Sequence, residues 1–153
     1  MKIMIGIDTG VKTGFSLAID YKDGKGGQLK DVSTLSITKA MEKVRLSIEK
    51  WGIENVKLYI EDARQRKWFG EADRRQLKSG AGVREGVGSV KRDAKIWEDW
   101  CKEEKYLYEM IHPAANLTKY DAVKFKKYTK WEGRTSEHGR DAAMLVHQRH
   151  AKF

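Results

Sequence analysis

The chain has little cysteine and proline, and it lacks any long apolar run. Its 153 residues include one cysteine, Cys101, which excludes an internal disulfide framework and a zinc site built from cysteines. A single proline and 40% hydrophobic residues argue against a disordered or linker-rich design. No segment approaches the roughly 20 apolar residues needed to cross a bilayer, and the N-terminus shows no signal-peptide pattern. We therefore expect one folded domain over residues 1–153, located in the cytoplasm.

Basic residues outnumber acidic ones. The chain has 31 Lys and Arg against 22 Asp and Glu, a formal net charge of +9, and its isoelectric point is near 9.6. Such a surface favours a polyanion, which is either nucleic acid or an acidic membrane. The sequence has no lipidation signal and no strongly apolar amphipathic helix, so we expect nucleic acid and no membrane as the partner.

The order of apolar segments predicts the fold class. Strands are expected at residues 2–8, 13–19, 28–37, 56–60 and 106–111, and helices at residues 39–51, 96–105, 120–129 and 136–150. Thr38 is the expected cap of the first helix and Gly52 its stop. This order, βββαβαβα with one further helix, indicates an α/β fold with a mixed five-stranded sheet and helices on its faces.

Two carboxylates stand at the ends of predicted strands. Asp8 ends the first strand before a turn, where it fits either an Asx-turn or a cleft. Glu61 also follows an apolar strand, and no role in a helix accounts for an acidic residue at this position. Strand alternation places Glu61 on the side of Tyr59 and Asp62 on the opposite side. Two acids at strand ends indicate a site that includes Asp8 and Glu61.

A third acidic segment begins a predicted helix near the C-terminus. His138 and Asp141 are three residues apart, so they share one helical face, and the residues that follow are apolar. One interpretation is that Glu137, His138 and Asp141 only complement the positive helix N-terminus. The other is that the buried acid shares a divalent cation with Asp8 and Glu61.

Oxygen ligands of this kind favour Mg²⁺ or Mn²⁺. Two such ions about 4 Å apart can activate a water and stabilise the leaving oxygen during phosphodiester hydrolysis. Carboxylates from three distant segments suit that arrangement. His138 could ligate the second ion or position the attacking water, and the sequence leaves both roles open.

Three motifs, in this order, resemble the RuvC-type Holliday junction resolvases of the RNase H-like superfamily. The matching residues are Gly6-Ile7-Asp8-Thr9-Gly10 with Thr13-Gly14-Phe15 downstream, Ile60-Glu61, and His138-Gly139-Arg140-Asp141-Ala142-Ala143. The βββαβα order is also the core of that family, so the resemblance covers nearly the whole chain. It implies an RNase H-like fold. The small size and the divergent segment between Arg64 and Lys95 resemble phage-encoded members, which implies the cytoplasm of a bacterium or phage-infected host.

The resemblance also implies an activity. Members of the family are homodimers that bind four-way or otherwise branched DNA and nick symmetric strands using Mg²⁺. Carried over to this chain, the catalytic and metal-binding residues are Asp8, Glu61, His138 and Asp141, with two Mg²⁺ ions for which Mn²⁺ substitutes. Some members have an aspartate where His138 stands.

Basic residues follow Glu61 closely. Between Arg64 and Arg92 there are nine basic residues against three acids. This stretch, with Trp68 and Phe69 available to stack on or wedge between bases, predicts a DNA contact; the alternative is a solvated helix with an aromatic anchor. The expected DNA-binding residues are Arg64, Arg66, Lys67, Trp68, Phe69, Arg74, Arg75, Lys78, Arg84, Lys91 and Arg92, with Lys124 from a second basic stretch.

Other features favour simpler interpretations. The glycines at positions 80–88 match neither a dinucleotide fingerprint nor a P-loop, so we expect no nucleotide cofactor. A second basic stretch from Lys119 to Arg134 either grips a duplex arm or is a solvated face. His147 and His150 lie three apart, and a solvated helix end explains them better than a metal pair does.

Two other functions compete with a junction resolvase. A nuclease of the same fold could act on an RNA:DNA hybrid or on flapped DNA, and the catalytic residues do not separate these substrates. A non-catalytic protein that binds branched DNA would keep the fold and the charge. Against it stand the three ordered carboxylates, because acids without a cation would repel phosphate.

Overall fold

The computed structural model describes residues 1–65, 81–115 and 119–153, without the side chains at positions 81–87, 90 and 114. The strands are β1 (Lys2–Asp8), β2 (Lys12–Asp20), β3 (Gly27–Ser36), β4 (Val56–Glu61) and β5 (Leu107–Ile111). The helices are α1 (Ile37–Trp51), α3 (Ala81–Glu104), α4 (Ala122–Thr129) and α5 (Glu137–Met144), with short 3-10 turns at Ile53–Asn55, Ala63–Gln65 and Pro113–Ala115.

The strands form one mixed sheet in the order β3-β2-β1-β4-β5. The first three strands run antiparallel to their neighbours along the chain, whereas β4 and β5 join by parallel pairing. The predicted α/β fold class with a mixed five-stranded sheet is confirmed. In the parallel pairing of β1 with β4, Ile7 lies opposite Ile60, so both strands end at the same edge of the sheet.

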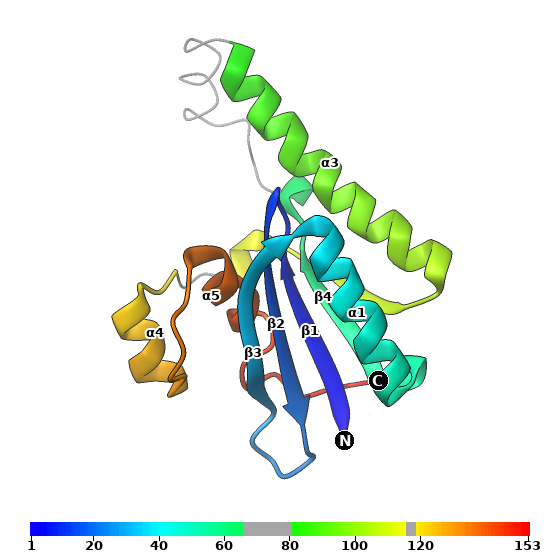
Figure 1. The fold of residues 1–153 in the computed structure, drawn as a ribbon, viewed down its shortest axis with the longest axis vertical. Coiled ribbons are helices and arrows are strands. Elements are labelled where there is room, and N and C mark those ends of the chain that lie inside the picture. The colour runs from blue at the N-terminus through cyan, green and yellow to red at the C-terminus, as the bar shows by residue number, and fades with distance from the viewer. Residues whose placement is uncertain (66–80, 116–118) are drawn as a thin grey trace.

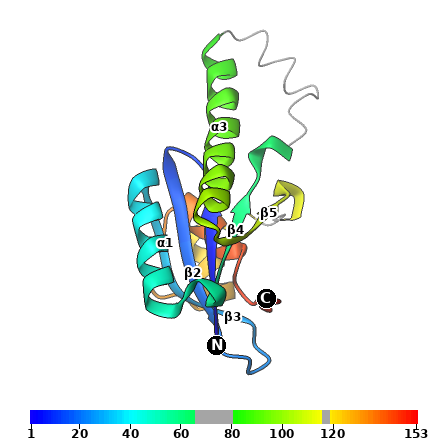
Figure 2. The same ribbon diagram turned by 90° about the vertical axis from the view of Figure 1, so that its right-hand side faces the viewer.

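Helices cover both faces of the sheet (Figure 1). On one face, Ile3, Ile5 and Ile7 alternate along β1 and pack with residues of α1 and α3, such as Val44 and Trp97. On the other face, the intervening residues of the strands meet α5 and the segment that follows it. Figure 2, turned by 90°, shows α1 and α3 side by side over the first face. This strict alternation explains why every position in β1 after Lys2 is buried.

The first helix begins earlier than predicted. The side chain of Ser36, not Thr38, accepts a hydrogen bond from the backbone N–H of Lys39, 3.3 Å away, and caps α1. Gly52 ends the helix as predicted, with a φ of 87° that favours glycine. The helix expected at residues 96–105 is also longer than predicted and begins at Ala81.

The last helix ends earlier than predicted. The helix expected at residues 136–150 stops at Met144 and continues as a turn. The physical reason is a tertiary pairing: Gly27 N–H donates to the Arg149 carbonyl, and Gln148 N–H donates to the Gly27 carbonyl, both at 2.8 Å. This pairing attaches the C-terminal segment to the start of β3 and competes with the helix for the same backbone groups. None of the described helices is long and apolar enough to cross a membrane.

Candidate functional site

Asp8 and Glu61 are neighbours at the edge where β1 and β4 end. Each follows the paired residues Ile7 and Ile60 by one position, and each is buried, with 9% and 3% of its surface exposed. Alternation places both on the α5 face of the sheet, the face of Tyr59. The two carboxylates therefore project side by side from adjacent parallel strands.

Asp62 faces the other way, as strand alternation predicts. Its carboxylate accepts hydrogen bonds from the side chains of Arg64, at 2.7 Å, and Gln65, at 3.1 Å. Burial alone would raise the pKa of Asp62, but the hydrogen bonds from Arg64 and Gln65 outweigh it and hold this pKa below its usual value. Asp62 thus anchors the Ala63–Gln65 turn and does not join the acidic site.

Glycines let α5 lie directly on the sheet. A Cβ atom at Gly6 would overlap the backbone carbonyl of Ala142, and one at Gly14 would overlap that of His138. Gly139 makes the same approach from the helix side, because its Cβ would meet the carbonyl oxygen of Ser33 at 3.1 Å. Backbone contacts this close are possible only without side chains. They fix the start of α5 over the end of β1.

The docked helix brings His138 and Asp141 to the strand-end acids. His138 Nδ1 lies 3.0 Å from Asp8 Oδ2. Asp141 is 5% exposed and accepts a hydrogen bond of 2.7 Å from the ammonium of Lys119. The four predicted site residues, Asp8, Glu61, His138 and Asp141, therefore come together from β1, β4 and α5.

The negative charges act on one another strongly. Burial raises the pKa of Asp8 from 3.8 to about 6, and the charges of Glu61 and Asp141 add to this rise, while the hydrogen bond with His138 and the charge of Lys119 oppose it. Burial would lower the pKa of Lys119, but its hydrogen bond with Asp141 and the charges of Glu61, Asp141 and Asp8 raise it. The site is therefore an acidic cluster compensated by the ammonium of the half-exposed Lys119.

The residues present fit a divalent cation by their chemistry. They offer carboxylate oxygens and an imidazole nitrogen, which are ligands of Mg²⁺ and Mn²⁺ sites. Lys119 already places a positive charge among the three carboxylates. Among the described residues, no group of three or more His, Cys, Asp or Glu side chains is close enough to share a metal ion as it stands.

Arg140 positions the segment that carries Lys119. Its guanidinium donates to the backbone carbonyl of Tyr120 at 2.9 Å and to that of Thr135 at 3.2 Å. Because Tyr120 follows Lys119 directly, this bridge ties Lys119 to α5. This role of Arg140 was not predicted from the sequence, in which Lys119 was only part of a basic stretch. A glycine inside a strand often marks a close approach of another backbone, so Gly6 and Gly14 were the signal in the sequence for the contact between α5 and the sheet.

A pocket of about 620 Å³ opens beside His138. Its lining includes Lys12 from the start of β2, Lys39 from α1, and Ser136 and Glu137 from the start of α5. The hydroxyls of Thr34 and Ser136 are hydrogen-bonded to each other at this point. The acidic cluster thus borders an open space whose walls carry both lysines and hydroxyls.

The predicted DNA-binding residues are only partly described. Arg66, Lys67, Trp68, Phe69, Arg74, Arg75 and Lys78 lie outside the described residues, as does the side chain of Arg84. Arg92 and Lys124 are exposed, and Lys91 is half-buried. Arg64 is bonded to Asp62 and, at 3.3 Å, to Glu98, so its charge is compensated locally. Their contact with DNA stays a prediction.

Comparisons with known proteins support the fold. No family model and no curated protein matches the sequence. Among solved structures, the chain is similar to T. thermophilus RuvC in complex with a Holliday junction substrate. The TM-score is 0.56, the identity is 11%, and the match covers 97% of this chain and 92% of that chain. The likeness shows a RuvC-like variant of the RNase H-like fold and, at this identity, the fold alone.

Proposed function

We propose that this chain is a metal-dependent endodeoxyribonuclease that resolves Holliday junctions or other branched DNA by paired symmetric nicks. The observation that carries the proposal is the acidic cluster of Asp8, Glu61 and Asp141, with His138 bonded to Asp8. Buried carboxylates whose charges repel one another cost free energy, and a protein retains them where a cation or a reaction uses them. The net charge of +9 favours a polyanionic substrate.

Asp8, Glu61, His138 and Asp141 would hold Mg²⁺, and Mn²⁺ would substitute. When bound, the metal would activate a water for attack on phosphorus and stabilise the leaving oxygen. Asp8 orients His138: when the ionised carboxylate accepts from Nδ1–H, the neutral imidazole keeps Nε2 free of a proton. His138 Nε2 then has one free lone pair, which would either ligate a metal ion or accept a proton from the attacking water.

Lys119 has a compensating role in this proposal. Its ammonium neutralises part of the cluster through Asp141 and would have to yield that position as a divalent cation enters. The pocket beside His138, with Lys12 and Lys39 in its walls, would receive the phosphates that flank the cut bond.

The test compares cleavage of a labelled synthetic four-way junction with that of a matched linear duplex. Mg²⁺ should give paired symmetric nicks in the junction, and EDTA should prevent them. Asp8→Asn should reduce cleavage at least about 100-fold while junction binding persists. Equal cleavage of RNA:DNA hybrid or flapped DNA would assign a different nuclease. Tight junction binding without cleavage under any metal would assign a non-catalytic branched-DNA-binding protein.

A further inference from the structure

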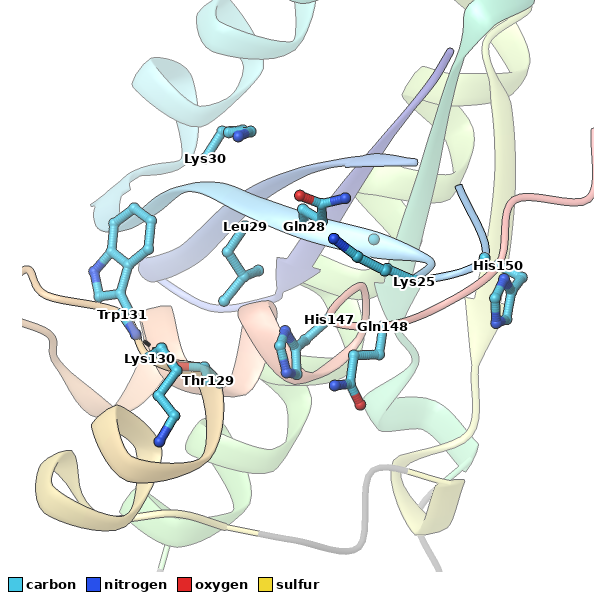
Figure 3. Close-up of a pocket in the computed structure, with 12 residues that line it drawn as sticks. Lys25, Gln28, Leu29, Lys30, Thr129, Lys130, Trp131, His147, Gln148 and His150 are labelled. Carbon is cyan, nitrogen blue, oxygen red and sulfur yellow. Dashed lines mark hydrogen bonds between the residues drawn. The ribbon is translucent and has the colours of Figure 1, made fainter. Parts of the chain in front are cut away.

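A second pocket lies away from the acidic cluster, at the other end of β3. It has a volume of about 670 Å³, within the usual range for ligand pockets. Figure 3 shows its lining, which comes from the turn before β3 and the start of that strand, from the end of α4 and the residues just after it, and from the segment after α5. Between Gln28 in this pocket and Thr34 beside the acidic cluster, β3 rises by roughly 20 Å.

The pocket is built by tight backbone contacts. Gly27 exchanges two backbone hydrogen bonds with the C-terminal segment, and a Cβ at Gly27 would overlap the Val146 carbonyl. Lys130 and Gln148, both in the lining, adopt left-handed backbone conformations with φ of 62° and 56°. Lys130 is the C-cap of α4, and its N–H donates to the Lys126 carbonyl, whereas the Gln148 N–H donates to the Gly27 carbonyl. Capping and tertiary hydrogen bonds therefore hold both conformations. The pocket therefore has a fixed shape.

The charge around the pocket selects an anion. Exposed Lys25 and Lys130 lie on its rim together with His150. Lys30 also contributes to the lining, although its ammonium lies 5.4 Å from the centre of the Tyr21 ring. Among the described residues that line this pocket there is no carboxylate. Its electrostatic potential therefore favours a phosphate over a cation.

The interior selects a flat group with hydrogen-bonding edges. Both ring nitrogens of His147 are buried and have no hydrogen-bond partner among the described residues. Burial lowers the pKa of His147, so the ring is neutral at pH 7 and offers one donor and one acceptor. Leu29 and Trp131 give the pocket an apolar wall, and the amide of Gln148 lies beside His147 (Figure 3). A buried donor and acceptor without partners cost free energy. Because both nitrogens have almost no exposed surface, a ligand in the pocket would bond to them after the ring turns toward it.

We propose that this pocket binds one nucleotide of a single-stranded nucleic acid, with the base against His147 and Trp131 and the flanking phosphates at Lys25 and Lys130. The lysines at the rim match the negative charge of a phosphate. The neutral imidazole beside an apolar wall matches the flat ring and polar edge of a heteroaromatic base. A strand fits better than a free nucleotide, because the two lysines belong to separate segments and the pocket opens on the face of the sheet that carries α4 and α5. The site does not use the acidic cluster and goes beyond the proposed nuclease function.

The first test measures binding of a fluorescein-labelled twelve-nucleotide oligothymidylate by anisotropy at several salt concentrations. The pocket variant is Lys25→Gln with Lys130→Gln. The matched control is Lys50→Gln with Lys105→Gln, which removes the same charge from two exposed lysines outside the pocket. Lys105 also has a positive φ, of 59°, so the control reproduces the backbone strain at Lys130.

The pocket variant should lower the slope of log K against log salt by about 1.4, since each phosphate contact on a single strand contributes about 0.7. The control should leave the slope unchanged. Equal slope changes in the two variants would overturn the proposal, because they would reflect only the net charge.

The second test follows the imidazole nitrogens by NMR with ¹⁵N-labelled histidine. The His147 signals should shift on addition of the unlabelled oligothymidylate, whereas those of exposed His112 should not. Unmoved His147 signals at saturation would overturn the proposal, and thymidine monophosphate binding as tightly as the oligonucleotide would overturn the strand assignment. Junction cleavage is a separate readout. A wild-type protein that binds the oligonucleotide but cuts no junction with any metal, or an Asp8→Asn variant that cuts normally, would count against the nuclease proposal alone.

Discussion

Asp8 has an environment that opposes its own ionisation. It is buried, it lies beside Glu61 and Asp141, and these effects raise its pKa to about 6. The opposing contributions from His138 and Lys119 are too small to restore the ordinary value. The ionised Asp8 carboxylate therefore lowers the stability of the metal-free protein. A bound divalent cation would stabilise the same carboxylate, because the cation reverses the sign of the local electric field.

Ionisation of Asp8 should therefore destabilise the native protein. Between pH 3.8 and about 6 the carboxyl is protonated in the native state but ionised in the unfolded chain, so the native state binds more protons and stability falls as the pH rises. The loss is complete above the native pKa and amounts to at most roughly 3 kcal/mol. Asp8→Asn should recover much of it at pH 7.5 in metal-free urea unfolding.

At pH 4 the gain from Asp8→Asn should nearly vanish, because the wild-type carboxyl is then largely neutral. Exposed Glu103 provides the control, since Glu103→Gln should change stability by no more than about 0.5 kcal/mol at either pH. An Asp8→Asn variant less stable than the wild type at pH 7.5 would contradict this account of the site.

Lys119 should compete with a divalent cation. Lys119→Gln removes the ammonium that Asp141 holds at 2.7 Å, so the metal-free variant should lose about 1 kcal/mol of stability, a modest amount because the lysine is half-exposed. Mg²⁺ should then raise the melting temperature of the variant more than that of the wild type. The measurement is a thermal melt across a Mg²⁺ titration. A smaller Mg²⁺ effect in the variant would show that Lys119 assists metal binding.

At the scale of elements, the site depends on how closely α5 packs on the sheet. The helix has only eight residues, Glu137–Met144, and an isolated helix of that length is not stable in water. Its position therefore comes from contact with β1, β2 and β3, through Gly6, Gly14 and Gly139. The same contacts set the separation of His138 from Asp8.

Gly14→Ala should displace the start of α5, because the added methyl group meets the backbone carbonyl of His138 and cannot be accommodated by a rotamer change. We expect a stability loss of about 1–3 kcal/mol, measured by urea unfolding, together with a large loss of junction cleavage. Gly88→Ala is the control: nothing lies within 4 Å of its Cβ position in α3, so this change should stabilise by about 0.5–1 kcal/mol. A neutral Gly14→Ala would contradict the packing argument.

At the scale of the whole molecule, a resolvase has to cut two strands. The described residues of one chain form one acidic cluster, so the proposed paired nicks in a four-way junction need two copies of the chain. We therefore expect a homodimer, whose sedimentation should give twice the monomer mass and whose junction complex should contain two chains. A protein that stays monomeric and binds the junction as a monomer would favour a nuclease with a single-cut substrate, such as a flap.

Part of this protein could be predicted from the local sequence. Successive side chains of a strand point to opposite faces, and this alternation assigned the two faces of β1. The same rule placed Glu61 and Asp62 on opposite sides of the sheet. Gly52 was found as a helix stop because a positive φ favours glycine. Thr38 failed as a cap because Ser36 competes for the same backbone donors two residues earlier, and propensity does not rank two hydroxyl residues so close together.

The amino-acid sequence by itself determined the order of strands and helices, the side of the sheet on which Asp8 and Glu61 lie, and the excess of positive charge. The first two follow from the periodicity of apolar residues, which is a local property of the sequence. The third follows from composition, which is a sum over the whole chain. Only the tertiary structure decided that Lys119 would bond to the acidic cluster, that α5 would stop at Met144, and that the half-buried His147 would line a pocket with both ring nitrogens covered. These depend on contacts between residues distant in the chain, such as Gly27 with Gln148 and Arg149, and no local pattern encodes which of the competing contacts has the lower free energy.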